Sequence, residues 1–209
     1  MRLDAVARAA CLAASAVFVC SLSFAQTRAS DGQVVLSFAG GSVWTSQSTG
    51  TCIWYFPILG DLEVSALFEP DGAGKPVIDG NHAYLIWVSD WSIQTASVNG
   101  PLSLAVLPAG EATVYFSKNP TTRDWSNRNT WGVAVAKFTR GGGLFQSPDG
   151  WQSDKFFFSA WLTSSKDFHI GSGKQFNFRD LIHRGMTCFE FGLNGSTYEA
   201  GTCTSMGGE

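Results

Sequence analysis

The segment TCFEFGLNGSTYEAGTCT, residues 187–204, has the pattern of a β-hairpin. A two-residue turn at Gly195-Ser196 would place glycine where a type II′ turn requires a positive φ angle. Cys188 would then lie directly opposite Cys203, within the Cα separation that a disulfide bond requires. A turn at Asn194-Gly195 fits the local sequence equally well and would offset the two cysteines. The segment therefore predicts a hairpin, and one of its two registers predicts a disulfide.

The cysteine count leaves three disulfide pairings possible. Past residue 25 the chain has three cysteines, Cys52, Cys188 and Cys203. An oxidising compartment favours one disulfide and one remaining thiol. We favour Cys188–Cys203 because the same register pairs Leu193 with Tyr198. The rival pairing joins Cys52 to either late cysteine and would tie an early strand to a late one. In the favoured pairing, Cys52 is a buried thiol in an apolar strand.

Period-2 alternation dominates the rest of the chain and predicts short β-strands. In LEVSALFE, residues 62–69, the apolar side chains Leu62, Val64, Ala66 and Phe68 would share one face. Other segments rich in β-forming residues lie at 34–39, 51–56, 82–89, 91–98, 102–107, 112–118, 131–138, 155–162, 166–170 and 175–178. These segments together with the hairpin predict about a dozen strands.

The punctuation between these segments predicts a single all-β domain. Asp-Gly and Gly-Gly pairs separate the segments and supply the positive φ angles of tight turns. Gly141-Gly142-Gly143 is interpreted as a turn or bulge. Helix is expected only over a turn or two in 177–184, where Asn177 is placed to cap it. We therefore expect residues 26–209 to form one antiparallel barrel or sandwich of roughly 8–12 short strands with little helix.

Residues 1–25 have the order of a secretory signal peptide. Arg2 and Arg8 precede the apolar run 9–20, and Ser23-Phe24-Ala25 places small residues before a cleavage at Gln26. The apolar run is shorter than the roughly 20 residues that span a bilayer, which argues against a membrane anchor. Because no other run is long and apolar enough, no integral membrane span is predicted. We expect an exported protein of the periplasm or the extracellular space.

Composition excludes some classes of partner. Charged residues make up 15% of the chain, the net charge is −3, and aromatic residues reach 13%. A protein that binds nucleic acid through its phosphates carries a basic patch or stripe, and this chain lacks one. The aromatic content instead suits a well-filled core or a pocket for a small ligand.

The longest polar stretch, residues 119–130, is the candidate ligand-binding loop. Indole rings next to fixed hydrogen-bonding groups suit a sugar, whose apolar face stacks on the ring while its hydroxyls pair with polar side chains. The alternative is structural, because tryptophans of β-rich proteins often pack in the core and Arg–Asp pairs on loops are often solvated. The residues predicted to bind ligand are Arg123, Asp124, Trp125, Asn127, Arg128 and Trp131, with Trp91 and Trp151 as further candidates.

Catalytic chemistry has weaker candidates. Asp167 with His169 and Asp180 with His183 are spaced to form acid–histidine pairs that could serve a nucleophilic site. No nucleophile elbow or zinc-protease motif accompanies them. Five glutamates are expected on solvent-exposed faces, so no glycosidase pair is predicted: Glu63, Glu69, Glu111, Glu190 and Glu199.

The sequence therefore supports three functional hypotheses. The first is a non-catalytic, exported β-barrel or β-sandwich that binds a small or apolar ligand, since a barrel of about eight strands can hold one. The second is a carbohydrate-binding module that uses the 119–131 loop. The third is a hydrolase or isomerase that uses an Asp–His pair. No metal and no cofactor is predicted, and a protein partner is a further possibility, since exposed strand edges can bind other chains.

Overall fold

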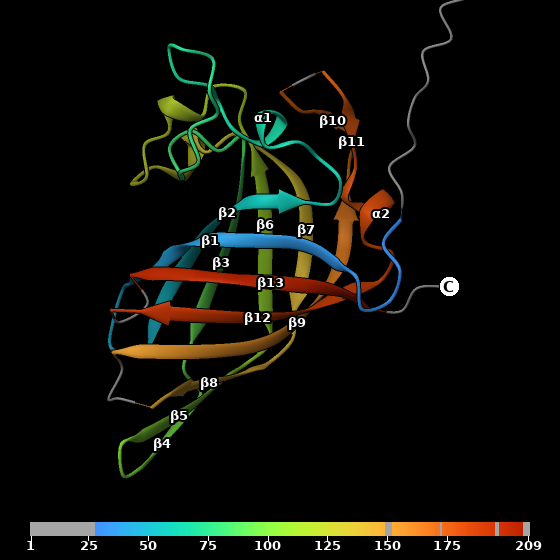
Figure 1. Ribbon diagram of the computed structural model, residues 1–209. Coiled ribbons are helices and arrows are strands. Elements are labelled where there is room, and N and C mark those ends of the chain that lie inside the picture. The colour runs from blue at the N-terminus through green and yellow to red at the C-terminus, as the bar shows by residue number, and fades with distance from the viewer. Residues whose placement is uncertain (1–27, 149–151, 172, 195–196, 207–209) are drawn as a thin grey trace, which may run out of the picture.

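The computed structural model describes residues 28–148, 152–171, 173–194 and 197–206, and these form a closed antiparallel barrel of eight strands (Figure 1). The all-β fold class expected from the sequence is therefore confirmed, in its barrel form. The elements are β1 (Val34–Trp44), β2 (Thr49–Leu59), α1 (Val64–Leu67), β3 (Leu85–Ser92), β4 (Thr95–Asn99), β5 (Leu102–Leu107), β6 (Gly110–Phe116), η1 (Pro120–Thr122), η2 (Arg128–Thr130), β7 (Val133–Arg140), β8 (Gly143–Ser147), β9 (Ser153–Ser165), β10 (Phe168–His169), β11 (Gln175–Phe176), α2 (Phe178–Leu181), β12 (Gly185–Leu193) and β13 (Tyr198–Met206).

The barrel wall follows the order β12-β13-β1-β2-β3-β6-β7-β9, and a further pairing of β9 with β12 closes it. Strand β9 is long enough to serve three neighbours. One of its edges pairs with β12 along residues 153–161. Its other edge pairs with β8 through residues 155–157 and with β7 through residues 160–165. Strand β9 is therefore the seam of the barrel.

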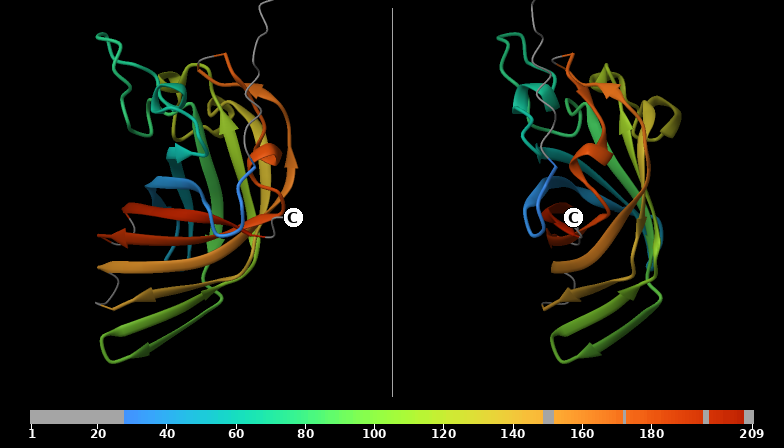
Figure 2. Two further views of the ribbon diagram at one scale, coloured as in Figure 1. Left: turned by 45° about the vertical axis from the view of Figure 1, so that its right-hand side comes forward. Right: turned by 90° about the vertical axis from the view of Figure 1, so that its right-hand side faces the viewer.

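Strands β8, β5 and β4 leave the barrel at this seam and form an arm. They pair in the order β9-β8-β5-β4 and extend the sheet beyond the closed wall. The arm lies at the bottom of Figure 1 and in both views of Figure 2, away from α1 and the small β10–β11 sheet at the top. It is not part of the eight-stranded closure.

Aromatic rings fill one part of the barrel interior. Phe38 stacks on Trp54 with ring centroids 4.3 Å apart, and Trp87 packs against Phe138 at 4.9 Å. Helix α2 adds the fully buried Phe178, whose ring meets Phe138 edge-on. Burying each such ring contributes roughly 1.5–3 kcal/mol, so this part of the interior is a conventional solid core.

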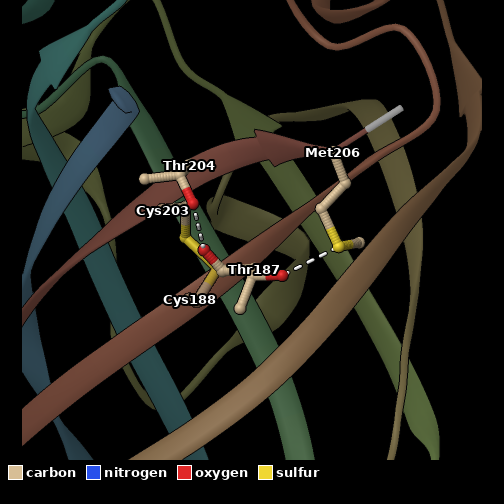
Figure 3. Close-up of a disulfide and its surroundings, with 5 residues drawn as sticks. All are labelled: Thr187, Cys188, Cys203, Thr204 and Met206. Carbon is tan, nitrogen blue, oxygen red and sulfur yellow. Dashed lines mark hydrogen bonds between the residues drawn. A yellow bond between two sulfur atoms is a disulfide. The ribbon is translucent and has the colours of Figure 1, made fainter. Parts of the chain in front are cut away.

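The hairpin predicted at 187–204 is present as β12 and β13. Its register pairs Cys188 with Cys203 and Leu193 with Tyr198, as the Gly195-Ser196 turn requires. The turn residues themselves lie outside the described part of the chain. The Cys188–Cys203 disulfide is formed with a Cα separation of 4.1 Å, and Thr204 and Met206 hydrogen bond to Thr187 beside it (Figure 3). A disulfide is consistent with an oxidising compartment.

Two strand assignments differ from the expectation. Residues 62–69 do not form a strand: α1 occupies 64–67, and Ala66 and Leu67 bury their side chains from it. The chain leaves β2 through Gly60 at φ 56°, so it turns over the barrel end instead of continuing along the sheet. Residues 91–98 divide between the end of β3 and β4.

The expectations for Gly143 and for the short helix in 177–184 can also be compared with the structure. Gly143, expected in a turn or bulge, begins β8. Helix α2 is present within 177–184, and the Asn177 side chain accepts the backbone N–H of Arg179 as its N-cap. Within the described residues, no helix has the length and apolar character needed to cross a membrane.

Removal of the disulfide is expected to lower the free energy of unfolding. Cys188 and Cys203 are 15 residues apart, and cross-linking a loop of that length contributes about 3 kcal/mol in the chain-entropy model. The double variant Cys188→Ala/Cys203→Ala should therefore lose about 2–4 kcal/mol in urea unfolding. Equal unfolding midpoints for the variant and the oxidised protein would contradict this expectation.

Candidate ligand pocket inside the barrel

A pocket occupies the end of the barrel where β1, β3 and β7 finish and β2 and β13 begin. The space that a water-sized molecule can reach inside it is about 20 Å³, and the hollow measures about 460 Å³ when its open mouth is included. Its lining comes from seven strands of the barrel wall and from Leu107 and Phe145 of the arm. Apolar walls with a few converging polar groups are the lining that small-molecule sites have in common.

Aromatic side chains form the outer part of the pocket. Trp44 and Trp91 meet edge to face with centroids 4.6 Å apart. Phe145 of the arm faces Phe156 of β9 at 6.4 Å. A side chain at Gly50 would collide with the Trp91 ring, since a Cβ there would lie 2.5 Å from it. Glycine at this position therefore gives the indole its place in the pocket.

Three carboxyl groups lie on one wall of the barrel, which we call the acid wall: Asp154 of β9, Glu190 of β12 and Glu199 of β13. Glu190 is 2% exposed and Glu199 is 5% exposed, so the expectation that both face solvent was wrong. The physical reason is the orientation of β12. Its outward positions are taken by Phe189 and Phe191, each 40% exposed, which turns the glutamate between them inward.

The acid wall requires a neighbouring residue without a side chain. Gly192 of β12 lies opposite Asp154 of β9 and opposite Glu199 of β13. A Cβ at Gly192 would overlap the Asp154 carboxylate. The glycine therefore lets three carboxyl groups from adjacent strands gather at one level of the barrel.

Burial and mutual repulsion raise the pKa of both glutamates. For Glu190 the first cause is burial, followed by the charges of Glu199 and Asp154, and the Asp154 carboxyl is within hydrogen-bonding reach. For Glu199 burial again raises the pKa, while hydrogen bonds from the Ser42 hydroxyl and the Trp54 indole N–H partly offset it. Two carboxyl groups in hydrogen-bonding contact must share a proton, so the acid wall is partly protonated near neutral pH.

Arg140 and Trp91 supply hydrogen-bond donors on another wall, which we call the donor wall. Arg140 is 2% exposed; its Nε donates to Ser89 Oγ and its Nη1 to the carbonyl oxygen of Gly141, each at 3.3 Å. Its guanidinium also lies 5.9 Å from the Phe156 ring centroid. Burial lowers the pKa of Arg140. Both hydrogen bonds go to neutral oxygens, and none of the ion pairs within the described residues includes Arg140.

Among the described residues Cys52 is the free thiol, and it also lines the pocket. Its Sγ accepts a hydrogen bond from the Ser42 hydroxyl at 3.1 Å. Burial is the main reason why the pKa of this thiol is raised well above its ordinary value. A protonated, buried thiol is a poor nucleophile, which agrees with the structural role expected for Cys52.

The predicted binding loop lies elsewhere, against the outer surface of the barrel. Trp131 is buried there on Ile86 and Val88, which point outward from β3. Arg128 forms a bidentate ion pair with Asp90 and lies 5.5 Å from the Trp131 ring. These residues thus secure the loop to the outer face of the wall, and Asp90 is the chain neighbour of Trp91, which lines the interior pocket.

The remaining loop residues also have internal contacts. Arg123 donates to the carbonyl oxygens of Gly80 and Tyr84. The Asp124 carboxylate accepts the backbone N–H and hydroxyl of Ser126, and Asn127 caps η2. Trp125 is 37% exposed and donates its indole N–H to Asn81. Sugar binding by this loop stays a prediction, and Trp151 lies outside the described residues.

The predicted Asp–His pairs are not joined by a hydrogen bond among the described residues. Asp167 instead accepts the side-chain amides of Gln175 and Asn177. His169 and Asp180 are exposed, and His183 is half-buried. The His–Asp contact that is present joins His82 to Asp79 at 2.8 Å, with both side chains partly exposed.

Sequence reasoning missed the interior polar groups. The signal that could have indicated these groups is the sequence Phe189-Glu190-Phe191, an acid between two aromatic residues in a strand. The acid and the two rings lie on opposite faces of the strand, and only one of these faces can be buried inside the barrel. Glycines at the neighbouring inward positions, Gly192 and Gly201, are a second signal for close packing on that face. No group of three or more metal-ligating side chains is arranged to hold a metal ion within the described residues.

The acid wall should make stability depend on pH. A carboxyl whose pKa is raised in the folded state stabilises the fold fully below its ordinary pKa of about 4.3, and that contribution is lost as pH rises above it. We expect the melting temperature to fall from pH 5 to pH 8.5. Glu190→Gln should flatten this dependence and add about 1.4 kcal/mol or more at pH 8.5, the equivalent of one pKa unit. Glu111→Gln, which removes an exposed carboxylate, is the control, and an equal response of both variants would contradict the assignment.

The outer loop should respond as a structural element. Arg128→Ala removes an exposed ion pair and should cost less than about 1 kcal/mol. Trp131→Ala removes a buried indole and should cost about 3–5 kcal/mol. Chemical unfolding of the two variants measures both effects. The opposite ranking would show that Trp131 is not the anchor of this loop.

Comparison with known proteins does not supply a relative. No family model, no curated protein and no solved structure matches the chain. Any role for the protein is therefore inferred from the chemistry of its own residues, chiefly those inside the barrel.

Proposed function

We propose that this chain is an exported, non-catalytic protein that binds a small ligand inside the barrel. The observation that carries the proposal is the placement of buried ionisable groups in an aromatic-walled pocket. Arg140, Glu190 and Glu199 are each at most 5% exposed. Burying charged groups costs several kcal/mol each unless they are well paired. Groups that weaken the fold and line a pocket are the ones expected to serve a ligand.

The fold does not need polar groups at this position. The other part of the interior closes with stacked aromatic rings such as Phe38, Trp54 and Phe158. The same solution at the pocket end would give a more stable barrel. The contrast between the two parts supports a role for the pocket in binding.

The same residues give less support to a catalytic function than to ligand binding. The thiol of Cys52 is protonated, and the Asp–His pairs of the sequence are not joined within the described residues. The glycan-binding alternative has one observation in its favour, the partial exposure of Trp125 beside Asn81 on the outer loop. The two candidate sites contain different tryptophans, so substitutions can test them separately.

The test uses native mass spectrometry of the purified protein with a panel of small metabolites and oligosaccharides. We expect a bound small molecule whose affinity falls about tenfold or more in Trp91→Ala, because that indole forms the pocket wall. Trp125→Ala and Trp161→Ala are matched controls, since both indoles are exposed on the outside. Binding that is lost in Trp125→Ala and kept in Trp91→Ala would place the site on the outer loop. Absence of binding across the panel would overturn the proposal.

A further inference from the structure

The two charged walls of the pocket are each incomplete. On the acid wall, no N–H or O–H group of the described residues donates to Oε1 of Glu190, although the side chain is 2% exposed. Its polar neighbours are Asp154 and Glu199, which are acids themselves. A group that brought N–H donors to this wall would replace the shared proton and satisfy both carboxylates.

The donor wall lacks an acceptor. The indole N–H of Trp91 is buried and has no hydrogen-bond partner within the described residues. Arg140 and Trp91 also line a second, more open depression on the surface, together with Asp90 and Gly110. A guanidinium in this setting is suited to a planar carboxylate, which it can bind through two parallel hydrogen bonds.

The acids and the arginine do not neutralise each other, although both line one pocket. In a low-dielectric interior, opposite charges attract strongly unless something keeps them apart. None of the ion pairs within the described residues joins Arg140 to Glu190 or Glu199, and the rings of Phe156, Trp91 and Trp44 line the same pocket. The space between the walls is therefore suited to a molecule that carries both charges.

We propose that the pocket binds a zwitterionic ligand of the amino-acid type. Its ammonium group contacts Glu190 and Glu199 on the acid wall, and its carboxylate contacts Arg140 and the Trp91 indole N–H on the donor wall. The rings of Trp44, Phe145 and Phe156 select an apolar or aromatic side group. This inference rests on the proposed function and specifies the chemical class of the ligand.

Two simpler ligands are the competing possibilities. An amine without a carboxylate would use the acid wall and the aromatic rings, which also attract cations. An apolar acid would use Arg140 and the rings alone. Each would leave one wall in its present, incomplete state, which is why the zwitterion fits the observations better.

Isothermal titration of the purified protein with three matched compounds tests the proposal. L-Phenylalanine carries both charges, phenethylamine lacks the carboxylate, and 3-phenylpropionate lacks the ammonium group. We expect L-phenylalanine to bind about tenfold or more tightly than either analogue, a difference of about 1.4 kcal/mol. An analogue that binds as tightly as L-phenylalanine would overturn the role of the wall that it does not use. Absence of binding by all three would also overturn the proposal.

Neutral variants assign the two walls. Glu190→Gln should remove the preference for L-phenylalanine over 3-phenylpropionate, and Arg140→Gln should remove the preference over phenethylamine. Glu111→Gln and Arg128→Gln make the same changes outside the pocket and should leave both preferences unchanged. Unchanged preferences in Glu190→Gln and Arg140→Gln would contradict the assignment. If Arg140→Gln does not fold, Trp91→Phe removes a donor of the same wall and keeps an aromatic ring.

The failure of this inference can be separated from failure of the proposed function. If the three phenyl compounds do not bind, but another compound of the panel binds in a Trp91-dependent manner, the zwitterion is excluded and the interior site stands. If no compound of either set binds, both proposals fail.

Discussion

The pairing of β9 with β12 is the contact on which this structure depends. Nine residue pairs, from Gly185 with Trp161 to Leu193 with Ser153, join the last part of the wall to the first and turn a sheet into a barrel. Closure gives every wall strand two partners and separates an inside from an outside. The inward positions of β9, β12 and β13 become buried only because this seam is formed. The acid wall is thus a product of closure as much as of sequence.

The interior that closure creates has two parts with opposite energetics. One part is packed with rings and stabilises the fold through buried apolar surface. The other holds Arg140 and the carboxyl groups, whose desolvation works against folding. Gly50 and Gly192 make room for Trp91 and Asp154 in that second part. The arrangement combines a stable core with a polar pocket in one small barrel.

The sequence predicts the fold well where local geometry decides it, as in the hairpin. A two-residue turn fixes every pair along β12 and β13, so the choice between two adjacent turns left two registers, and the observed one places Cys188 opposite Cys203. The pocket could not be predicted in the same way, because alternation divides residues between two faces and does not say which face is inside. Glu190 and Glu199 were therefore expected to face solvent. Closure through β9, a contact distant in sequence, reverses this assignment.

The arm formed by β4, β5 and β8 lines part of the pocket without being part of the closed barrel wall. It contributes Leu107 and Phe145 to the lining, yet the barrel closes through β7, β9 and β12 without it. Changes of length or sequence in the β4–β5 hairpin therefore leave the seam intact while they alter the shape of the pocket mouth. The arm is in this way a separable part of the pocket lining, open to variation that the closure of the barrel does not constrain.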